Sequence, residues 1–125
     1  MKKLTAFLLA CVLLITVAFA APIMPRSGYY NGNVSVSSGR TWTSGRYKIP
    51  STVSNVYLDA SVTEGGDVKV ELYGASSTSG SGTKVGTINT ATGSSLSVSR
   101  NYAYYYFKVV NSSGEKSTVY VMLST

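Results

Sequence analysis

Residues 53–73, VSNVYLDASVTEGGDVKVELY, decide the fold. On either side of Glu64-Gly65-Gly66-Asp67, apolar and polar residues alternate with a period of two, which is typical of a strand with one buried face. Glycine readily adopts a positive φ, so the two glycines mark a turn. The pattern predicts a β-hairpin with strands over 53–63 and 68–73. Its inward side chains are Val56, Leu58, Ala60, Val62, Val68, Val70 and Leu72.

The chain on either side of this segment repeats the pattern in shorter runs separated by Gly, Ser and Asn. Ser44-Gly45 predicts a break or bulge in one run, Gly86 predicts a bulge in another, and residues 75–83 indicate a polar loop. Regularly spaced short strands predict an all-β fold, a single antiparallel β-sandwich of about eight strands over residues 29–125. The other expected strands are 29–36, 41–49, 84–90, 96–98, 102–110 and a last one carrying Val119, Val121 and Leu123.

The N-terminus has the features of a secretory signal peptide. A cationic start, Lys2-Lys3, precedes an almost wholly apolar run over residues 4–19. Ala18 and Ala20 form a small-x-small cleavage signal, which predicts a cut before Ala21. We therefore expect residues 1–20 to be removed and residues 21–28 to form a flexible mature N-terminus. The protein is expected to be secreted, or periplasmic in a Gram-negative cell.

Two alternatives for this N-terminal segment stay open. A membrane anchor needs about 20 apolar residues, slightly more than the run contains, and we expect no membrane span in the mature chain. Leu8-Leu9-Ala10-Cys11 also resembles a lipoprotein lipobox, in which Cys11 would carry the lipid. Against the lipobox, apolar residues continue after Cys11, whereas the apolar region of a signal should precede the cut.

The composition excludes several kinds of catalytic site and metal site. The chain has no histidine, and its single cysteine, Cys11, lies in the signal segment. The usual serine–histidine and cysteine–histidine nucleophiles are therefore excluded, as are zinc or copper sites with histidine or thiolate ligands. The few acids offer no pair with the separation and burial that a glycosidase needs. We expect a protein that is not an enzyme and binds no cofactor.

The predicted mature chain is modestly basic. Only Lys2 and Lys3 of the 11 Lys and Arg residues belong to the signal segment, and the whole chain has five acids. A positive field favours anionic partners, although a charge of this size is also that of an ordinary soluble surface. We expect the partner to be a polysaccharide or an anionic envelope polymer, and we expect no nucleic acid.

Tyrosine is the unusual component, because all ten tyrosines follow residue 28. Side chains two apart on one strand face lie about 6.6 Å from each other, so a row of phenols would form a flat platform for sugar rings. Cross-strand pairing alone also accounts for tyrosine in a sheet, and the segment also has the features of a self-stacking strand. The predicted platform is Tyr102, Tyr104, Tyr106 and Lys108, opposite a buried face of Ala103, Tyr105, Phe107 and Val109.

A second candidate ligand site surrounds the only tryptophan. In a continuous strand over 41–49 the even-numbered residues share one face, which would place basic side chains around the indole. Such a patch is suited to an anionic polymer, with the indole stacked on Arg or on the ligand. A charged edge strand that resists aggregation is the alternative. The patch consists of Arg40, Trp42, Arg46 and Lys48.

Three acids near the predicted turn, Asp59, Glu64 and Asp67, form a candidate site for Ca²⁺, which takes six to eight oxygen ligands. Their spacing is not that of an EF-hand loop, and solvated turn acids are the alternative.

Several segments resemble the small secreted jelly-roll modules grouped as bacterial pre-peptidase C-terminal domains and their carbohydrate-binding relatives. The similar segments are RYKIP (46–50), DVKVELY (67–73), YYYFKV (104–109) and TVYVML (118–123). Where the family usually has a second aspartate in its acidic strand, this chain has Lys69 and Glu71, which departs from the family's ion-binding pattern. The resemblance implies a jelly-roll-like fold and an accessory, non-enzymatic role.

Together these features predict a secreted, non-enzymatic binding module for a polymer of the cell surface or matrix. Two other hypotheses are retained. One is a self-associating extracellular structural or matrix protein, and the other is a small secreted inhibitor or toxin-like factor.

Overall fold

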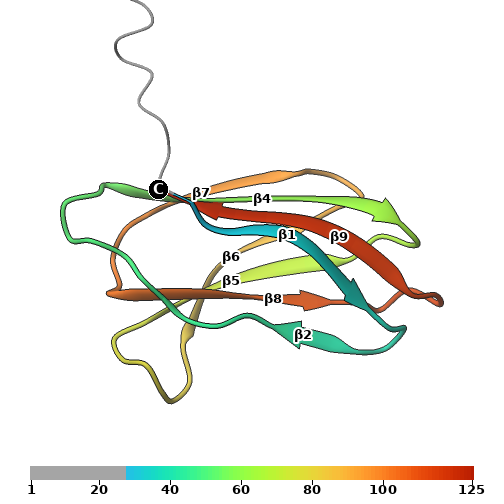
Figure 1. Ribbon diagram of the computed structural model, residues 1–125, viewed down its shortest axis with the longest axis horizontal. Helices are drawn as coiled ribbons and strands as arrows, with labels where there is room; N and C mark the ends of the chain where they lie inside the picture. Colours follow the sequence, from blue (N-terminus) through green and yellow to red (C-terminus); the bar gives the residue numbers. More distant parts are fainter. Residues whose placement is uncertain (1–27) are drawn as a thin grey trace, which may run out of the picture.

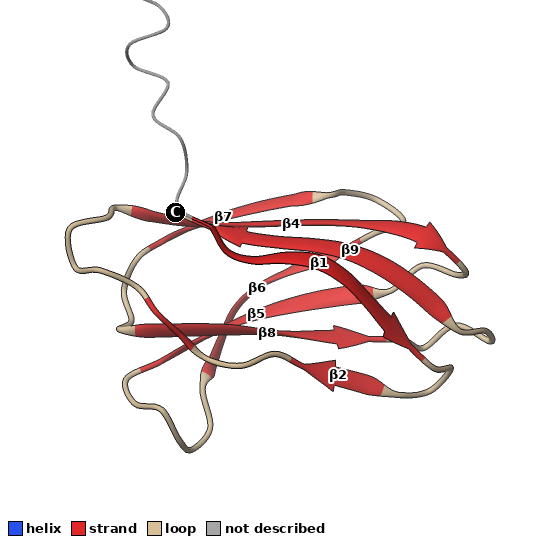
Figure 2. Cartoon of the chain, in the orientation of Figure 1, coloured by secondary structure: helices blue, strands red, loops and turns tan. Residues whose placement is uncertain are grey.

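The computed structural model describes residues 28–125, which form nine β-strands and no helix (Figures 1 and 2). Consequently, no helix in this part of the chain is long and apolar enough to cross a membrane. The predicted signal peptide, its cleavage site and Cys11 lie outside the described residues. The strands are β1 (Gly28–Val36), β2 (Thr41–Thr43), β3 (Tyr47–Lys48), β4 (Asn55–Glu64), β5 (Lys69–Ala75), β6 (Thr83–Asn89), β7 (Ser95–Ser99), β8 (Tyr104–Val110) and β9 (Ser117–Ser124).

The strands form two antiparallel sheets packed as two layers (Figure 1). Sheet A has the order β1-β9-β4-β7, and sheet B has the order β2-β8-β5-β6, with β3 also paired to β8. The pairs β1–β9, β2/β3–β8, β4–β7 and β5–β6 are nested within one another. The chain is therefore one long hairpin, with its tip between β5 and β6, rolled into two layers. This is the arrangement of a jelly roll, so the predicted small β-sandwich is confirmed.

The predicted hairpin over residues 53–73 is wrong in its pairing. Strand β4 lies in sheet A between β9 and β7, whereas β5 lies in sheet B between β8 and β6. The link between them crosses from one layer to the other, and the buried Leu58 and Leu72 both contribute to the core between the layers. A period of two fixes which side chains are buried, but not whether the next strand lies beside the first or across the core.

The first glycine of this link, Gly65, is nevertheless required. Gly65 has a positive φ of 89°, and a Cβ built on it would lie 2.1 Å from the carbonyl oxygen of Lys116. The hydroxyl of Ser117 donates a 2.6 Å hydrogen bond to the carbonyl oxygen of Gly66. The crossing therefore packs directly on the start of β9, where a side chain at position 65 has no room.

The predicted strand over residues 41–49 is divided into β2 and β3 by the break expected at Ser44-Gly45. Ser44 N donates to Phe107 O at 2.9 Å, and Phe107 N donates to Ser44 Oγ at 2.9 Å. The serine hydroxyl thus replaces a backbone carbonyl of the ladder, and the chain leaves the sheet after Thr43 and rejoins it at Tyr47. The bulge expected near Gly86 is also present, because the β5–β6 register passes from Leu72↔Gly86 to Tyr73↔Lys84.

The core lies between the sheets and is aliphatic except for Tyr105 and Phe107. Tyr30 and Trp42 pack against Phe107, with ring centroids 5.2 and 5.6 Å from it. Residues 28–125 contain no cysteine, so no disulfide joins them and the burial of this apolar surface is the main source of their stability.

Candidate functional site

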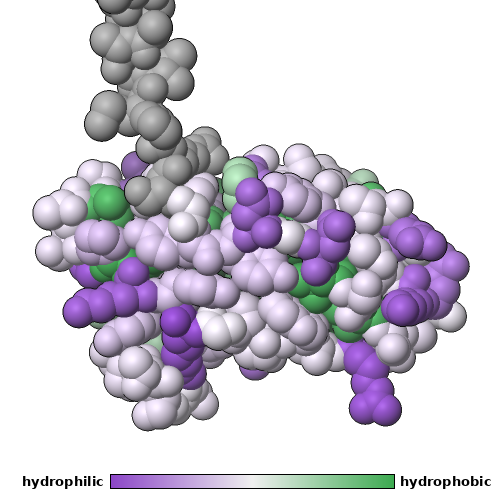
Figure 3. Space-filling model, viewed as in Figure 1, coloured by the Kyte–Doolittle hydropathy of each residue, from purple (hydrophilic) through white to green (hydrophobic). Residues whose placement is uncertain are grey.

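Charged side chains are divided unequally between the two sheets. The strands of sheet A contain two acids, Asp59 and Glu64, and no Lys or Arg. The strands of sheet B contain four lysines and one acid, Glu71, and Arg46 directly precedes β3. Figure 3 shows a surface covered mainly by weakly polar side chains, with strongly hydrophilic groups standing apart. On such a surface the outer face of sheet B forms a distinct basic face, made of Arg46, Lys48, Lys69, Lys84 and Lys108.

Two tyrosines lie at the centre of the basic face. Tyr73 of β5 and Tyr106 of β8 are register partners, and their rings stack with centroids 5.1 Å apart and planes 11° from parallel. The guanidinium carbon of Arg46 lies 4.6 Å from the centroid of the Tyr106 ring, and Lys108 Nζ lies 4.9 Å from that of Tyr73. Each ring therefore holds one cation by a cation–π contact.

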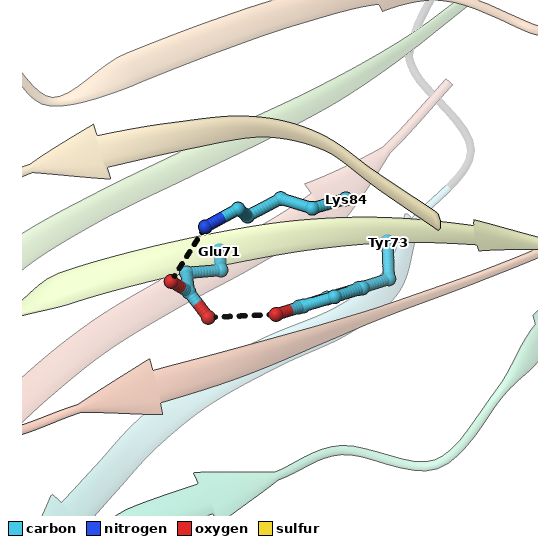
Figure 4. Close-up of polar contacts among 3 residues, drawn as sticks. All are labelled: Glu71, Tyr73 and Lys84. Carbon is cyan, nitrogen blue, oxygen red and sulfur yellow. Dashed lines mark hydrogen bonds and ion pairs between the residues drawn. The ribbon is translucent and has the colours of Figure 1, made fainter. Parts of the chain in front are cut away.

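The single acid of sheet B is neutralised within the sheet (Figure 4). The Tyr73 hydroxyl donates to Glu71 Oε1 at 2.8 Å, and Lys84 Nζ forms an ion pair with Glu71 Oε2 at 3.2 Å. Burial alone would raise the pKa of Glu71, but the hydrogen bonds from Tyr73 and Lys84 outweigh it and lower that pKa. The hydrogen bond to Glu71, followed by burial, raises the pKa of Tyr73. At neutral pH the carboxylate thus offsets Lys84, and the rest of the basic face stays positive.

The loop of residues 76–82, at the β5–β6 tip, is tied to this aromatic pair. Arg46 donates from Nη1 to the carbonyl oxygens of Ser77 and Ser79, at 2.9 and 3.2 Å, and from Nη2 to that of Gly80. Gly82 N donates to the Tyr106 hydroxyl at 3.0 Å. The predicted polar loop therefore has a defined position over the sheet.

A pocket of about 430 Å³ lies between this loop and the sheet. Its charged lining residues are Arg46 and Lys108, and no acid lines it. The hydroxyl-bearing side chains of the lining are Thr43, Tyr73, Ser81 and Tyr106. The pocket therefore offers positive charge and hydrogen-bonding groups.

The structure brings together parts of both predicted ligand sites. Tyr106 and Lys108, from the predicted platform, meet Arg46, from the predicted basic patch, at the pocket. Tyr104 and Lys48 are register partners on the same outer face. Tyr106 is only 5% exposed, because Arg46 and Gly82 cover it. It therefore anchors the loop and does not offer an open ring to a ligand.

Tyr102 departs from the predicted platform. The chain bends at residues 102–103 and β8 starts only at Tyr104, so strand parity does not extend back to Tyr102. Its ring packs edge-on against the buried Tyr105, with centroids 6.0 Å apart, and it fills the space beside Gly74. The continuous row of three phenols is therefore not formed.

The predicted basic patch is also divided. The break at Ser44-Gly45 shifts strand parity by one residue, so Trp42 faces inward onto Phe107 while Lys48 faces outward beside Tyr104. Arg40 lies in the turn before β2, where its backbone N–H donates to Ser37 O. Arg40 and Trp42 do not line the pocket. Of the predicted patch, only Arg46 and Lys48 lie on the basic face.

The structure does not bring together the three acids of the Ca²⁺ candidate, because the hairpin that would gather them does not form. Asp59 accepts a hydrogen bond from Ser95 on sheet A at 2.9 Å, and Asp67 accepts one from Thr90 at 3.0 Å. Glu64 lies at the end of β4, beside the turn that precedes β9. Within residues 28–125, no three His, Cys, Asp or Glu side chains come together as metal ligands.

Sequence reasoning missed Glu71, Tyr73 and Lys84 as site residues. The alternation over 68–73 correctly placed Glu71 and Tyr73 on the outer face, but no local signal shows that β5 lies beside β8. Comparison with protein-family models and with curated proteins finds no match for this chain.

Proposed function

We propose that this protein is a secreted, non-enzymatic module that binds an anionic polysaccharide or wall polymer of the cell surface or matrix through the basic face. The observation that carries the proposal is the division of charge between the layers: the strands of sheet B contain four lysines, with Arg46 directly before β3, whereas the strands of sheet A contain no Lys or Arg. A polymer with repeated negative charges gains from contact with several such cations at once.

The contacts of these cations support the proposal. Arg46 and Lys108 rest on the tyrosine rings, and within residues 28–125 neither forms an ion pair with a carboxylate, although Lys108 lies across the strands from Glu71. The acid nearest to them, Glu71, is already engaged by Lys84 and Tyr73. The face is an antiparallel sheet, which presents side chains at regular intervals of about 4.8 Å across strands and about 6.6 Å along them. Such a surface is suited to an extended chain rather than to a compact ligand.

The test is binding of the purified protein to polygalacturonate, with uncharged dextran as the control polymer. We expect polygalacturonate to bind and dextran not to bind. The affinity should fall steeply with salt, because the screening length shrinks from about 10 Å at 0.1 M to about 3 Å at 1 M. Affinity that does not change with salt, or equal binding of dextran, would contradict an electrostatic mechanism.

Matched variants locate the surface. Replacing Lys48 and Lys69 by Gln removes two cations of the basic face outside the ring contacts. Replacing Arg40 and Lys116 by Gln removes two exposed cations that lie in turns. We expect the first pair to weaken polygalacturonate binding by about tenfold, and the second pair by about twofold or less. Equal losses would mean that net charge, rather than this face, determines binding.

We propose self-association as a second candidate function, because both edges of sheet A lack the usual protection. Edge strands commonly carry charges or proline, and β1 and β7 contain neither. The two edges run antiparallel to each other, so β7 of one copy is oriented to extend the sheet at β1 of the next. The tyrosine-rich segment considered for self-stacking is different, because β8 is already paired on both sides.

Sedimentation velocity over a range of protein concentrations tests self-association. We expect a concentration-dependent series of oligomers, abolished by Ser97→Lys on the β7 edge and retained in Ser112→Lys, an exposed turn position. A monomer at all concentrations would remove this candidate.

A further inference from the structure

The pocket under the 76–82 loop has the properties of a small-ligand site as well as being part of the basic face. Its volume of about 430 Å³ lies within the range of about 300–1,000 Å³ that is usual for such sites. Its two charged lining residues are both cations, and they are accompanied by the hydroxyls of Thr43 and Ser81. Positive charge together with hydroxyl groups matches a sugar unit that carries a carboxylate.

The two cations of the pocket have different roles. Arg46 has its guanidinium over the ring of Tyr106 and directs its N–H groups to the carbonyl oxygens of Ser77, Ser79 and Gly80. A guanidinium has five N–H donors in a rigid fork, and most of this fork is turned toward the loop. Arg46 therefore acts on the shape of the pocket wall rather than directly on a ligand.

Lys108 is the cation that remains available to a ligand. Its Nζ lies over the ring of Tyr73, and within residues 28–125 it has no hydrogen-bond partner. An ammonium has three donors, and a cation–π contact uses the charge without accepting any of them. The hydrogen bond from the Tyr73 hydroxyl to Glu71 fixes the ring beneath it, so the position of the ammonium is defined before a ligand arrives.

The loop itself depends on these contacts. Residues 76–81 are exposed and consist only of Ser, Thr and Gly, so no apolar packing holds them. At Gly82 a Cβ would lie 2.7 Å from the Tyr106 hydroxyl and 2.9 Å from the carbonyl oxygen of Gly74, so the backbone there must approach the sheet closely. The hydrogen bonds of Arg46 and Tyr106 are thus the contacts that hold the loop over the sheet.

We propose that this pocket is a preformed subsite for one carboxylated sugar unit of the polymer, in which Lys108 binds the carboxylate and Arg46 is a positioning residue that holds the loop. The inference rests on the proposed function and deepens it, because it assigns one site and one ligand chemistry within the basic face.

The experiment uses trigalacturonate, which is too short to span the whole face, with maltotriose as the neutral control. Backbone amide chemical shifts are followed during titration of the unmodified protein. We expect trigalacturonate to shift the amides of residues 43–46, 80–82 and 106–108, and maltotriose to shift none of them. Shifts spread over the whole face, or no shifts while polygalacturonate still binds, would overturn the subsite and leave the proposed function standing.

Variants then separate the two roles. Lys108→Met keeps the aliphatic stem over Tyr73 and removes the charge, and should weaken trigalacturonate binding by about tenfold with a smaller dependence on salt. Lys48→Gln, a basic-face control outside the pocket, should weaken trigalacturonate binding by about twofold or less but still weaken polygalacturonate binding. Equal losses of trigalacturonate binding in the two variants would overturn the subsite.

Arg46→Lys keeps the charge but loses the fork. We expect weaker trigalacturonate binding with an unchanged dependence on salt, together with faster amide exchange confined to residues 76–82. Unchanged exchange in the loop would overturn the positioning role. If Arg46→Lys does not fold, the comparison of Lys108→Met with Lys48→Gln decides whether the subsite exists. Failure of polygalacturonate itself to bind would count against the proposed function as well.

Discussion

At the scale of single residues, side chains replace backbone groups where the chain leaves a sheet. The Ser44 hydroxyl accepts the N–H of Phe107, which would otherwise lack a partner between β2 and β3. Asn111 donates to the carbonyl oxygens of Val36 and Glu115, at 2.8 Å each, and accepts from Ser113 N. Both Ser44 and Asn111 are buried, where an unpaired N–H or C=O group is costly.

Ser44→Ala should therefore destabilise the protein, because the buried Phe107 N–H loses its acceptor. We expect a loss of about 1–3 kcal/mol in the free energy of unfolding, measured by urea denaturation. Ser37→Ala, an exposed position in the turn after β1, serves as the control and should change stability by about 0.5 kcal/mol or less. Similar effects in the two variants would show that the serine hydroxyl does not complete the ladder.

Gly65→Ala should be more costly than Gly39→Ala, although both glycines have a positive φ. At Gly39 nothing lies within 4 Å of a new Cβ, so the cost is conformational, about 1–2 kcal/mol. At Gly65 the Cβ would also clash with the carbonyl oxygen of Lys116, and we expect a loss of about 3 kcal/mol or more. Thermal unfolding of the two variants measures the difference, and equal losses would argue against the tight crossing between β4 and β5.

The Glu71–Tyr73 pair predicts how stability changes with pH. Because the folded state lowers the pKa of Glu71, its contribution is present above the unfolded pKa of about 4.3 and is lost as pH falls through the folded value. Because the folded state raises the pKa of Tyr73, its contribution is present below about pH 10 and is lost as pH rises through the folded value. Glu71→Gln should flatten both limbs of the stability–pH curve measured by urea unfolding, and unchanged limbs would contradict the pairing.

At the scale of elements, strand positions could be predicted from the sequence and strand partners could not. The link between β4 and β5 has four residues, and an extended link of that length spans about 13–14 Å, enough to cross the roughly 10 Å between packed sheets. Link length therefore does not distinguish a hairpin from a crossing. The true hairpin, β5–β6, is joined instead by the longer Ser- and Gly-rich loop of residues 76–82, which has no strong turn signal.

The candidate site was predictable only within unbroken strands. Parity correctly placed Tyr106 and Lys108 on the outer face of β8, because that strand is regular from Tyr104 onward. It failed for Tyr102 and Trp42, which lie beyond a bend and before a break in the ladder. The Tyr73–Tyr106 stack joins residues more than 30 positions apart, and depends on the β5–β8 pairing that alternation does not reveal.

Deleting residues 77–80 tests the independence of the β5–β6 tip. The two strands are paired as far as Gly74↔Thr83, so we expect the shortened protein to keep its β-sheet circular dichroism spectrum and most of its stability. Polygalacturonate should still bind, and trigalacturonate should not. A deletion of the same size over residues 65–68 removes the crossing between the layers and should prevent folding. Folding of the second variant would contradict the observed topology.

At the scale of the whole molecule, nested pairing makes the last strand as necessary as the first. Strand β9 lies between β1 and β4 and contributes the buried Val119, Val121 and Leu123 to the core. The chain cannot complete sheet A until its C-terminal segment is present. Because nearly all pairings join distant parts of the chain, we expect refolding on the millisecond-to-second scale of other β-sandwiches.

A chain that ends at Glu115 should therefore be unfolded. Strands β1 and β4 lose the strand that pairs with both of them, and the core loses the buried side chains of β9. Amide proton spectra should show little dispersion, and the near-ultraviolet signal of the tyrosines should be lost. Adding a peptide of residues 116–125 should restore both signals. In the shortened chain β1 and β4 would each have an unpaired backbone edge to which the peptide can add as a strand, as in other cases of strand complementation. A variant peptide with Val121→Lys, which places a charge in the core, serves as the control and should restore neither. If the shortened chain is folded without the peptide, β9 is not the central strand of sheet A. If it stays unfolded even with an excess of the unmodified peptide, β9 must be covalently part of the chain for the nested hairpin to close, and strand complementation does not apply to this fold.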